Sequence, residues 1–284
     1  TSGVPYEFCC LFVEELQDMT APDYPLELSI IVPAYNEEQR ILPTLARIVE
    51  YMDEGGAPYE IIVVDDGSRD ATRQVVHSFA ANHPTVRLES YDDKRGNPLN
   101  RGKGYAVRRG VLGAKGRNIL FSDADLSTPI EEMEKLLPSI DDGKCGVAIA
   151  SRALAGSNLA VHQPWYREAM GRTFNAFVQR IAVPGIQDTQ CGFKAFQGEA
   201  ARRIFKKARI DGFGFDTEVL FLARKYGYGV LEVPVTWRHR EDSRVSPFLA
   251  PLQMMRELLQ VRSNDRRGLY RERKPAKKPG QRSL

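Results

Sequence analysis

The chain has 284 residues, of which 42% are hydrophobic and 27% charged, and this composition excludes a disordered, collagen-like or coiled-coil protein. Its four cysteines show no C-x-x-C spacing, so a zinc ribbon or a disulfide framework is not expected, and we expect a reducing, cytoplasmic location. No run of about 18 apolar residues is present, so the sequence predicts no transmembrane helix.

The net charge of +3 is unevenly distributed along the chain. Residues 262–284 carry nine Lys or Arg against Asp265 and Glu272, a net of +7, which leaves −4 for residues 1–261. This basic segment is either a solvated tail or a segment attracted to anionic lipid head groups. Nucleic acid is not the expected partner, because the segment has one aromatic residue, Tyr270, and no recognition motif.

Elements follow one another in a regular order. Residues 1–25 form an N-terminal segment whose apolar spacing over 6–16 is compatible with a helix. From Leu26, apolar runs typical of buried strands alternate with helical patterns. Strands are expected at 28–32, 60–64, 86–89, 118–121 and 146–150, and helices at 41–52, 75–79, 104–112 and 129–137. This alternation predicts an α/β domain over residues 26–245, with a mostly parallel sheet flanked by helices.

Polar side chains follow four of the predicted strands at the point where each strand ends. They are Tyr35 to Glu37, Asp65 with Asp66, Asp123 with Asp125, and Ser151 with Arg152. The carboxyl ends of parallel strands meet at one edge of a sheet, where such folds bind ligands. We therefore expect these clusters to share one site.

Asp123 and Asp125 stand one residue apart after a buried strand. Like charges held this close favour a bound cation, and Mg²⁺ or Mn²⁺ suits carboxylate and phosphate oxygens. The competing interpretation is a turn in which Asp125 caps the helix near Pro129. The four histidines show no metal-ligand spacing, and neither a P-loop nor a G-x-G-x-x-G motif is present. A basic loop at 100–104 could approach a phosphate through Lys103.

The motifs, taken in order, resemble glycosyltransferase family 2 with its GT-A, Rossmann-like fold. They are 31–38 (IVPAYNEE), 63–68 (VVDDGS), 100–104 (NRGKG), 123–129 (DADLSTP) and 188–194 (DTQCGFK). The resemblance covers residues 26–245. It is strongest to the branch that glycosylates polyprenyl (dolichyl-type) phosphates, to its glucosyl members first and its mannosyl members second.

This resemblance implies a role for individual residues. Pro33, Tyr35 and Glu37 would line the nucleoside pocket, Asp66 would accept a hydrogen bond from the base, and Lys103 would lie near the nucleotide. Asp123 and Asp125 would hold the diphosphate and its metal ion, with Asp125 as the direct ligand. Ser127 stands where mannosyl members have a glutamine ligand. The residues expected at the donor or acceptor phosphates are Arg152, Arg172 and Arg244.

The implied reaction is an inverting, metal-dependent transfer of a hexose to a polyprenyl phosphate, with UDP-glucose as the favoured donor and GDP-mannose as the alternative. Two other hypotheses stay open. In one, the acceptor is a sugar or protein hydroxyl and Asp188 acts as the general base. In the other, the chain binds nucleotide sugars without catalysis.

Residues 246–284 are expected to form an amphipathic helix followed by the basic tail. Ser246 and Pro247 suit the first turn of a helix. Phe248, Leu252, Met255 and Leu259 recur at helical spacing. This stripe either packs on the core or lies on a membrane, which would make the protein peripheral at the cytoplasmic face.

Overall fold

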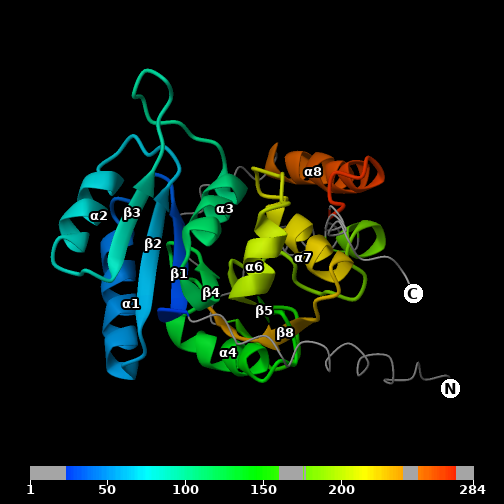
Figure 1. Cartoon of the computed structure of the whole chain (residues 1–284), viewed down its shortest axis with the longest axis horizontal. Helices are drawn as coiled ribbons and strands as arrows, with labels where there is room; N and C mark the ends of the chain where they lie inside the picture. The colour runs from blue at the N-terminus through cyan, green and yellow to red at the C-terminus, as the bar shows by residue number, and fades with distance from the viewer. Residues whose placement is uncertain (1–23, 160–174, 176, 239–248, 273–284) are drawn as a thin grey trace, which may run out of the picture.

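A computed structural model describes residues 24–159, 175, 177–238 and 249–272 (Figure 1). The helix predicted within 1–25, the basic tail from 273 onward, and the candidate residues Arg172 and Arg244 lie outside these ranges. The start of the C-terminal helix predicted at Ser246 lies outside them too.

The domain is built on a sheet of seven strands in the order β3-β2-β1-β4-β7-β5-β8. In chain order the strands are β1 (Leu26–Ala34), β2 (Tyr59–Asp65), β3 (Val86–Ser90), β4 (Gly116–Ser122), β5 (Val147–Ser151), β7 (Phe193–Gln197) and β8 (Val230–Pro234). Only β7 runs antiparallel to its neighbours, β4 and β5. Two short strands, β6 (Asn158–Leu159) and β9 (Thr236–Trp237), pair separately.

Helices cover both faces of the sheet (Figure 1). One face packs against α1 (Ile41–Gly55), α2 (Thr72–Ala80) and α4 (Met133–Asp141). The other packs against α3 (Lys103–Gly113), α6 (Gly198–Phe205), α7 (Phe215–Lys225) and α8 (Leu249–Arg266). Alternate residues of β1 serve the two cores: Ile31 belongs to one, and Ile30 and Val32 to the other. This burial on both faces explains why the strand reads as an unbroken apolar run.

The predicted fold class is confirmed, with differences in detail. The antiparallel strand β7 and the strand β8 were not predicted. The helix expected at 129–137 begins instead with a 3₁₀ turn at Ile130–Glu132 and continues as α4 to Asp141, past Pro138. Pro138 removes one backbone hydrogen bond from the interior of α4, and the burial of Leu136 and Ile140 on either side of it offsets that cost.

The C-terminal helix α8 packs on α7, mainly through residues outside the predicted stripe. Its core contacts are Leu258 and Val261, which are 1% and 0% exposed. Of the predicted stripe, Met255 also packs against this core, whereas Leu252 and Leu259 are 71% and 56% exposed, so the core-packing alternative holds only in part. A search of the described helices found none that combines the length and the apolar character needed to cross a bilayer.

Candidate functional site

A cavity of about 950 Å³ opens at the carboxyl ends of β1, β2, β4 and β5. It brings together nine of the predicted site residues: Pro33, Tyr35, Glu37, Asp66, Lys103, Asp123, Asp125, Ser127 and Arg152. Asp188 does not line it and lies against Arg152 instead. The expectation that polar strand ends converge on one site is therefore met for the described residues.

The loop after β1 forms one end of the cavity. Asn36 adopts a left-handed backbone with φ of 54°, which an asparagine tolerates better than most residues. Its backbone N–H donates to Ser68 Oγ at 2.9 Å, and its side-chain oxygen accepts from Arg69 N at 2.8 Å. The Glu37 carboxylate binds Arg40 through two hydrogen bonds. These contacts fix the loop that presents Pro33 and Tyr35.

Asp66 is 4% exposed, and its carboxylate already holds the loop across the cavity. It accepts the backbone N–H groups of Arg101 at 2.7 Å and Gly102 at 2.8 Å, and the hydroxyl of Tyr91. Burial raises its pKa, against these hydrogen bonds, which lower it. A carboxylate oxygen accepts about two hydrogen bonds, so only Oδ2 keeps room for a bond from a base.

The acid pair lies on the loop after β4. The backbone N–H of Asp123 donates to Gly192 O at 3.0 Å, and its Oδ1 lies 2.6 Å from Lys103 Nζ. Asp125 Oδ1 accepts the Ser127 N–H at 2.9 Å, an Asx turn rather than a helix cap. Both acids thus face the cavity on a short, internally bonded turn.

The acid pair fits a divalent cation that is shared with a substrate phosphate. Asp123 and Asp125 supply hard oxygen donors and both are partly exposed. Among the described residues no group of three or more His, Cys, Asp or Glu is arranged to hold a metal ion. Mg²⁺ characteristically takes one or two carboxylates and completes its shell with water and phosphate, so two acids suffice.

Arg152 and Asp188 form a bidentate ion pair at the end of β5. Arg152 Nε and Nη2 donate to Asp188 at 2.7 and 2.9 Å, and the Arg152 N–H adds a third bond at 2.9 Å. Burial would raise the pKa of Asp188, but the charge and hydrogen bonds of Arg152 outweigh it and lower the pKa. The Arg152 guanidinium also lies 5.4 Å from the centre of the Trp237 ring.

One part of the cavity wall rests on an ion pair between Lys194, the last residue of the 188–194 motif, and Asp216, which belongs to none of the motifs. Lys194 is fully buried, and its ammonium donates to Asp216 and to Cys191 O. Asp216 lines the cavity and is not among the predicted site residues. A lysine in the apolar run of β7 was the one sequence signal for this pair, because a buried lysine needs a partner.

The remaining wall is contributed by α8 and the loop that precedes α7. Glu257 Oε2 accepts the Gly214 N–H at 2.6 Å. A Cβ at Gly212 or Gly214 would overlap the Glu257 side chain, so these glycines permit the close approach. The residues of this wall are Arg209, Ile210, Asp211, Gly212, Phe213, Gln253, Met254, Glu257 and Gln260.

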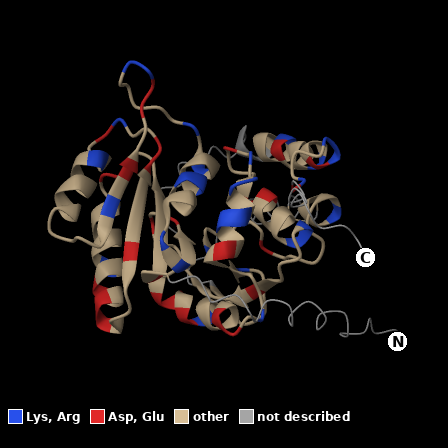
Figure 2. Cartoon of the chain, in the orientation of Figure 1, with Lys and Arg blue, Asp and Glu red and all other residues tan. Residues whose placement is uncertain are grey.

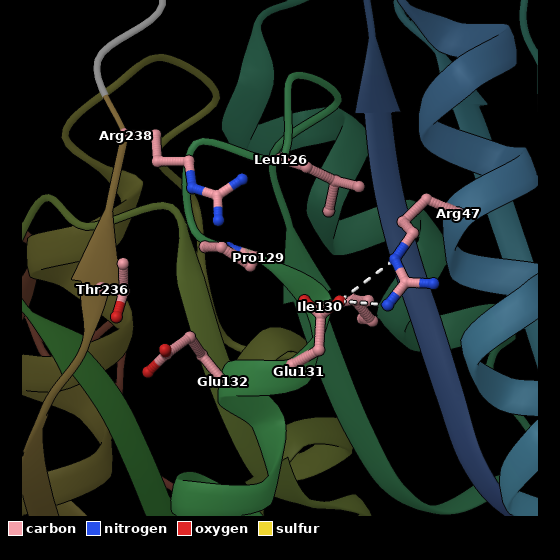
Figure 3. A pocket seen from close by; sticks show the side chains of 8 residues that line it. All are labelled: Arg47, Leu126, Pro129, Ile130, Glu131, Glu132, Thr236 and Arg238. Atoms are coloured by element: carbon pink, nitrogen blue, oxygen red, sulfur yellow. Dashed lines mark hydrogen bonds and ion pairs between the residues drawn. The ribbon is translucent and has the colours of Figure 1, made fainter. Parts of the chain in front are cut away.

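A second cavity, of about 370 Å³, lies on the other side of the acid loop (Figure 3). Leu126, in a left-handed backbone with φ of 46°, and Pro129 line it, whereas Asp125 and Ser127 line the main cavity. Arg47 binds Glu131 across its floor, and the Arg238 N–H donates to Ser127 O at 2.8 Å. None of the predicted site residues that the structure describes lines it, and these contacts support the acid loop from the side away from the main cavity.

Comparison with known proteins agrees with this geometry. The family model described as glycosyl transferase family 2 matches residues 29–205. The chain is 36% identical to dolichyl-phosphate beta-glucosyltransferase of Dictyostelium discoideum, over 86% of this chain and 76% of that protein. It is 38% identical to the Drosophila melanogaster enzyme of the same name, over 83% and 74%.

Solved structures show the same fold. Glucosyl-3-phosphoglycerate synthase from Mycobacterium tuberculosis superposes with a TM-score of 0.60 at 20% identity, covering 84% of this chain and 80% of that one. Mannosyl-3-phosphoglycerate synthase from Rubrobacter xylanophilus gives 0.62 at 19%, covering 90% and 79%. The family expected from the motifs is confirmed: this chain belongs to glycosyltransferase family 2.

Proposed function

We propose that this chain transfers glucose, with inversion, from UDP-glucose to a polyprenyl phosphate of the dolichyl type. The observation that carries the proposal is the likeness to two dolichyl-phosphate beta-glucosyltransferases at 36% and 38% identity. Each alignment covers about three quarters of that relative's length. A cavity that combines acids with Lys103 and Arg152 supports it. Because those relatives are glucosyltransferases, UDP-glucose is preferred to GDP-mannose.

In this proposal the donor lies along the motif-bearing side of the cavity. Pro33, Tyr35 and Glu37 line the nucleoside end, and Asp66 holds the adjoining loop. Lys103 lies beside the diphosphate. Asp123 and Asp125, with Ser127 next to them, would hold a Mg²⁺ or Mn²⁺ ion, which would supply positive charge to the leaving diphosphate.

The acceptor needs no general base. The second pKa of a phosphate ester is about 6, so its oxygen is already ionised at neutral pH and attacks the anomeric carbon directly. One bond forms from that oxygen to the anomeric carbon as the bond to the diphosphate breaks, and no proton has to move. Arg152 suits the acceptor phosphate because a planar guanidinium pairs with two phosphate oxygens. We assign Arg172 and Arg244 to the same phosphates.

Two alternative functions receive less support from the described residues. A hydroxyl acceptor would use Asp188 as its base, but that carboxylate is bound on both oxygens by Arg152 and has a lowered pKa. A protein that only binds nucleotide sugars would not require an acid pair, a lysine and an arginine in one cavity. We therefore assign Asp188 to positioning Arg152.

The acceptor also sets the location that we propose. A polyprenyl phosphate resides in a membrane, so the protein would associate with the membrane from its cytoplasmic side. Cys145 and Cys191 are free thiols, in keeping with a reducing compartment.

A donor screen tests this function. The full chain is incubated with a short, water-soluble polyprenyl phosphate, Mg²⁺ or Mn²⁺, and either UDP-glucose or GDP-mannose, and the sugar–lipid product is identified by mass spectrometry. Glucosyl-lipid from UDP-glucose is expected, with its loss in Asp125→Ala and its retention in Asp142→Ala, an exposed acid outside the cavity. Normal product from Asp125→Ala would refute the assigned site, and the absence of any sugar–lipid product with either donor would refute the proposed acceptor.

A further inference from the structure

The helix α8 has three faces with different surroundings. Leu258 and Val261 are buried against the core. Gln253, Met254, Glu257 and Gln260 line the main cavity. The third face, which we call the outer face, consists of Leu252, Arg256, Leu259, Arg262 and Arg266, which lie at helical spacing and are all exposed.

The outer face combines apolar surface with uncompensated positive charge. Leu252 and Leu259 are 71% and 56% exposed, so two large apolar side chains of one stripe face the solvent. Among the described residues no carboxylate pairs with Arg256, Arg262 or Arg266. The two acidic residues of α8, Glu257 and Asp265, bind groups outside the outer face.

Those two acids point away from the outer face. Glu257 binds the Gly214 N–H, and Asp265 pairs with Lys225 at 2.8 Å. The field at the outer face is therefore positive and is not neutralised within the helix.

Across the cavity from α8, a second group of exposed basic side chains is present. The loop between β3 and α3 projects from the body of the molecule, and Figure 2 shows positive charge at its tip. Lys94 and Arg95 are exposed there, while Asp92 pairs with Arg73 and Asp93 accepts backbone N–H groups of its own turn. The same loop continues through residues 100–102 into the cavity wall.

We propose that the outer face of α8 binds the surface of an anionic lipid bilayer, beside the cavity that receives the lipid acceptor. The inference rests on the proposed function, because only a membrane acceptor requires the cavity to face a bilayer. The outer face offers both contributions by which a helix attaches to an anionic bilayer, namely apolar side chains that can be buried among the head groups and positive charge that attracts the lipids. A nucleic-acid partner would be expected to meet aromatic side chains among the basic ones, and the outer face has none.

This placement would give the lipid acceptor a short path from the bilayer into the cavity. Met254 of α8 lines the cavity together with Phe213 and Ile210 of the loop before α7, and all three side chains are apolar. A polyprenyl chain leaving the bilayer beside α8 would meet these side chains before its phosphate reaches Arg152. Lys94 and Arg95 would contact the same bilayer from the other rim.

Vesicle flotation of the full chain tests the inference. The probes are phosphatidylcholine vesicles with and without phosphatidylserine. We expect binding only to the anionic vesicles, and a fall of at least about thirtyfold in the partition coefficient of Arg256→Glu/Arg266→Glu, because each basic side chain near such a surface contributes about 1 kcal/mol and about 1.4 kcal/mol is tenfold. Leu252→Ser/Leu259→Ser should weaken binding as well.

Matched controls carry the same changes at the other end of the sheet. Lys115→Glu/Lys144→Glu alters the net charge equally, and Leu112→Ser removes a leucine that is 47% exposed. The inference is overturned if the controls lose binding to the same extent, if the α8 variants bind vesicles normally, or if the chain binds RNA and not vesicles.

A second readout separates this inference from the proposed function. Transfer to a short, water-soluble polyprenyl phosphate needs no membrane, so the α8 variants should keep that activity. Vesicle binding without any transfer would leave the outer face supported and refute the function. Transfer without vesicle binding would support the function and refute membrane binding by the outer face.

Discussion

Arg152 donates from two guanidinium nitrogens to the two carboxylate oxygens of Asp188, and its own backbone N–H donates to the same group. Asp188 is in turn held from its backbone by Glu232, whose carboxylate accepts the Asp188 N–H at 2.9 Å. The arginine that faces the cavity is therefore fixed in one orientation by an acid behind it. A guanidinium oriented in advance loses less entropy when it binds a phosphate.

Asp188→Asn should destabilise the protein by about 3 kcal/mol at neutral pH, because it leaves Arg152 in a largely buried position without its counter-charge. Urea unfolding measures the change. Since the pKa of Asp188 is lowered in the folded protein, its stabilisation is full above the unfolded value of about 3.9 and is lost as the pH falls through the folded pKa. The difference between wild type and variant should therefore shrink below about pH 4.

Asp142→Asn is the control for this variant, because its pair with Lys144 is exposed and should contribute less than about 1 kcal/mol. Kinetics provides the second check. If Asp188 positions Arg152, the pH profile of the residual transfer keeps its shape in Asp188→Asn. Loss of an acidic limb from that profile would identify Asp188 as a base and contradict the positioning role.

Gly192→Ala should disable the acid loop while leaving the fold intact. A Cβ on Gly192 would overlap the Asp123 carboxylate, so that side chain would have to move. We expect Mn²⁺ affinity and transfer to fall about tenfold to hundredfold, as is usual when a ligand's support is disturbed. Mn²⁺ binding followed by electron paramagnetic resonance measures the first effect directly. Gly55→Ala, where a Cβ meets nothing within 4 Å, is the control, and equal losses in both variants would contradict the prediction.

The sequence predicted the parts of the fold that local pattern determines. β1, β2 and β4 are buried on both faces and read as continuous apolar runs, and their ends carry the polar residues that meet in the cavity. β7 was missed because Lys194 interrupts its pattern, and because its antiparallel insertion between β4 and β5 depends on long-range pairing.

The same limit applies to the site. Motif residues on strand ends were identified, whereas Asp216 and Glu257 reach the cavity only through the packing of α7 and α8. Apolar spacing could not decide which face of α8 is buried either, since Leu252 and Leu259 satisfy a helical stripe as well as Leu258 and Val261 do. Which stripe is buried depends on where α7 lies, and no local pattern contains that information.

Tyr270→Phe should lower the free energy of unfolding by about 1–3 kcal/mol, because it removes a hydrogen-bond donor from the buried carboxylate of Glu218. Burial raises the pKa of Glu218, against the hydrogen bonds that lower it, so losing one of them raises the pKa further. A carboxyl pKa raised on folding destabilises the folded state as the pH rises above the unfolded pKa, and the full penalty is present only above the folded pKa. The destabilisation, measured by urea unfolding, should therefore be larger at pH 7 than at pH 5.

Tyr228→Phe serves as the control for that prediction. Its hydroxyl accepts from Arg203 at 3.2 Å on the surface, and its loss should cost less than about 0.5 kcal/mol. A destabilisation by Tyr270→Phe that does not change with pH would show that Glu218 is not the group affected.

Lys103→Met should change donor and metal binding in opposite directions. Lys103 Nζ lies 2.6 Å from Asp123 Oδ1, where it neutralises an oxygen that a cation would otherwise use. Without nucleotide, Mn²⁺ should bind the variant about tenfold more tightly, because the positive charge beside Asp123 is gone. The KM for UDP-glucose should rise about tenfold or more, since a charge-assisted bond to the diphosphate is lost. Lys115→Met, on an exposed lysine outside the cavity, controls for removal of a charge, and a fall in both affinities in Lys103→Met would show that the lysine supports the acid loop instead of competing with the metal.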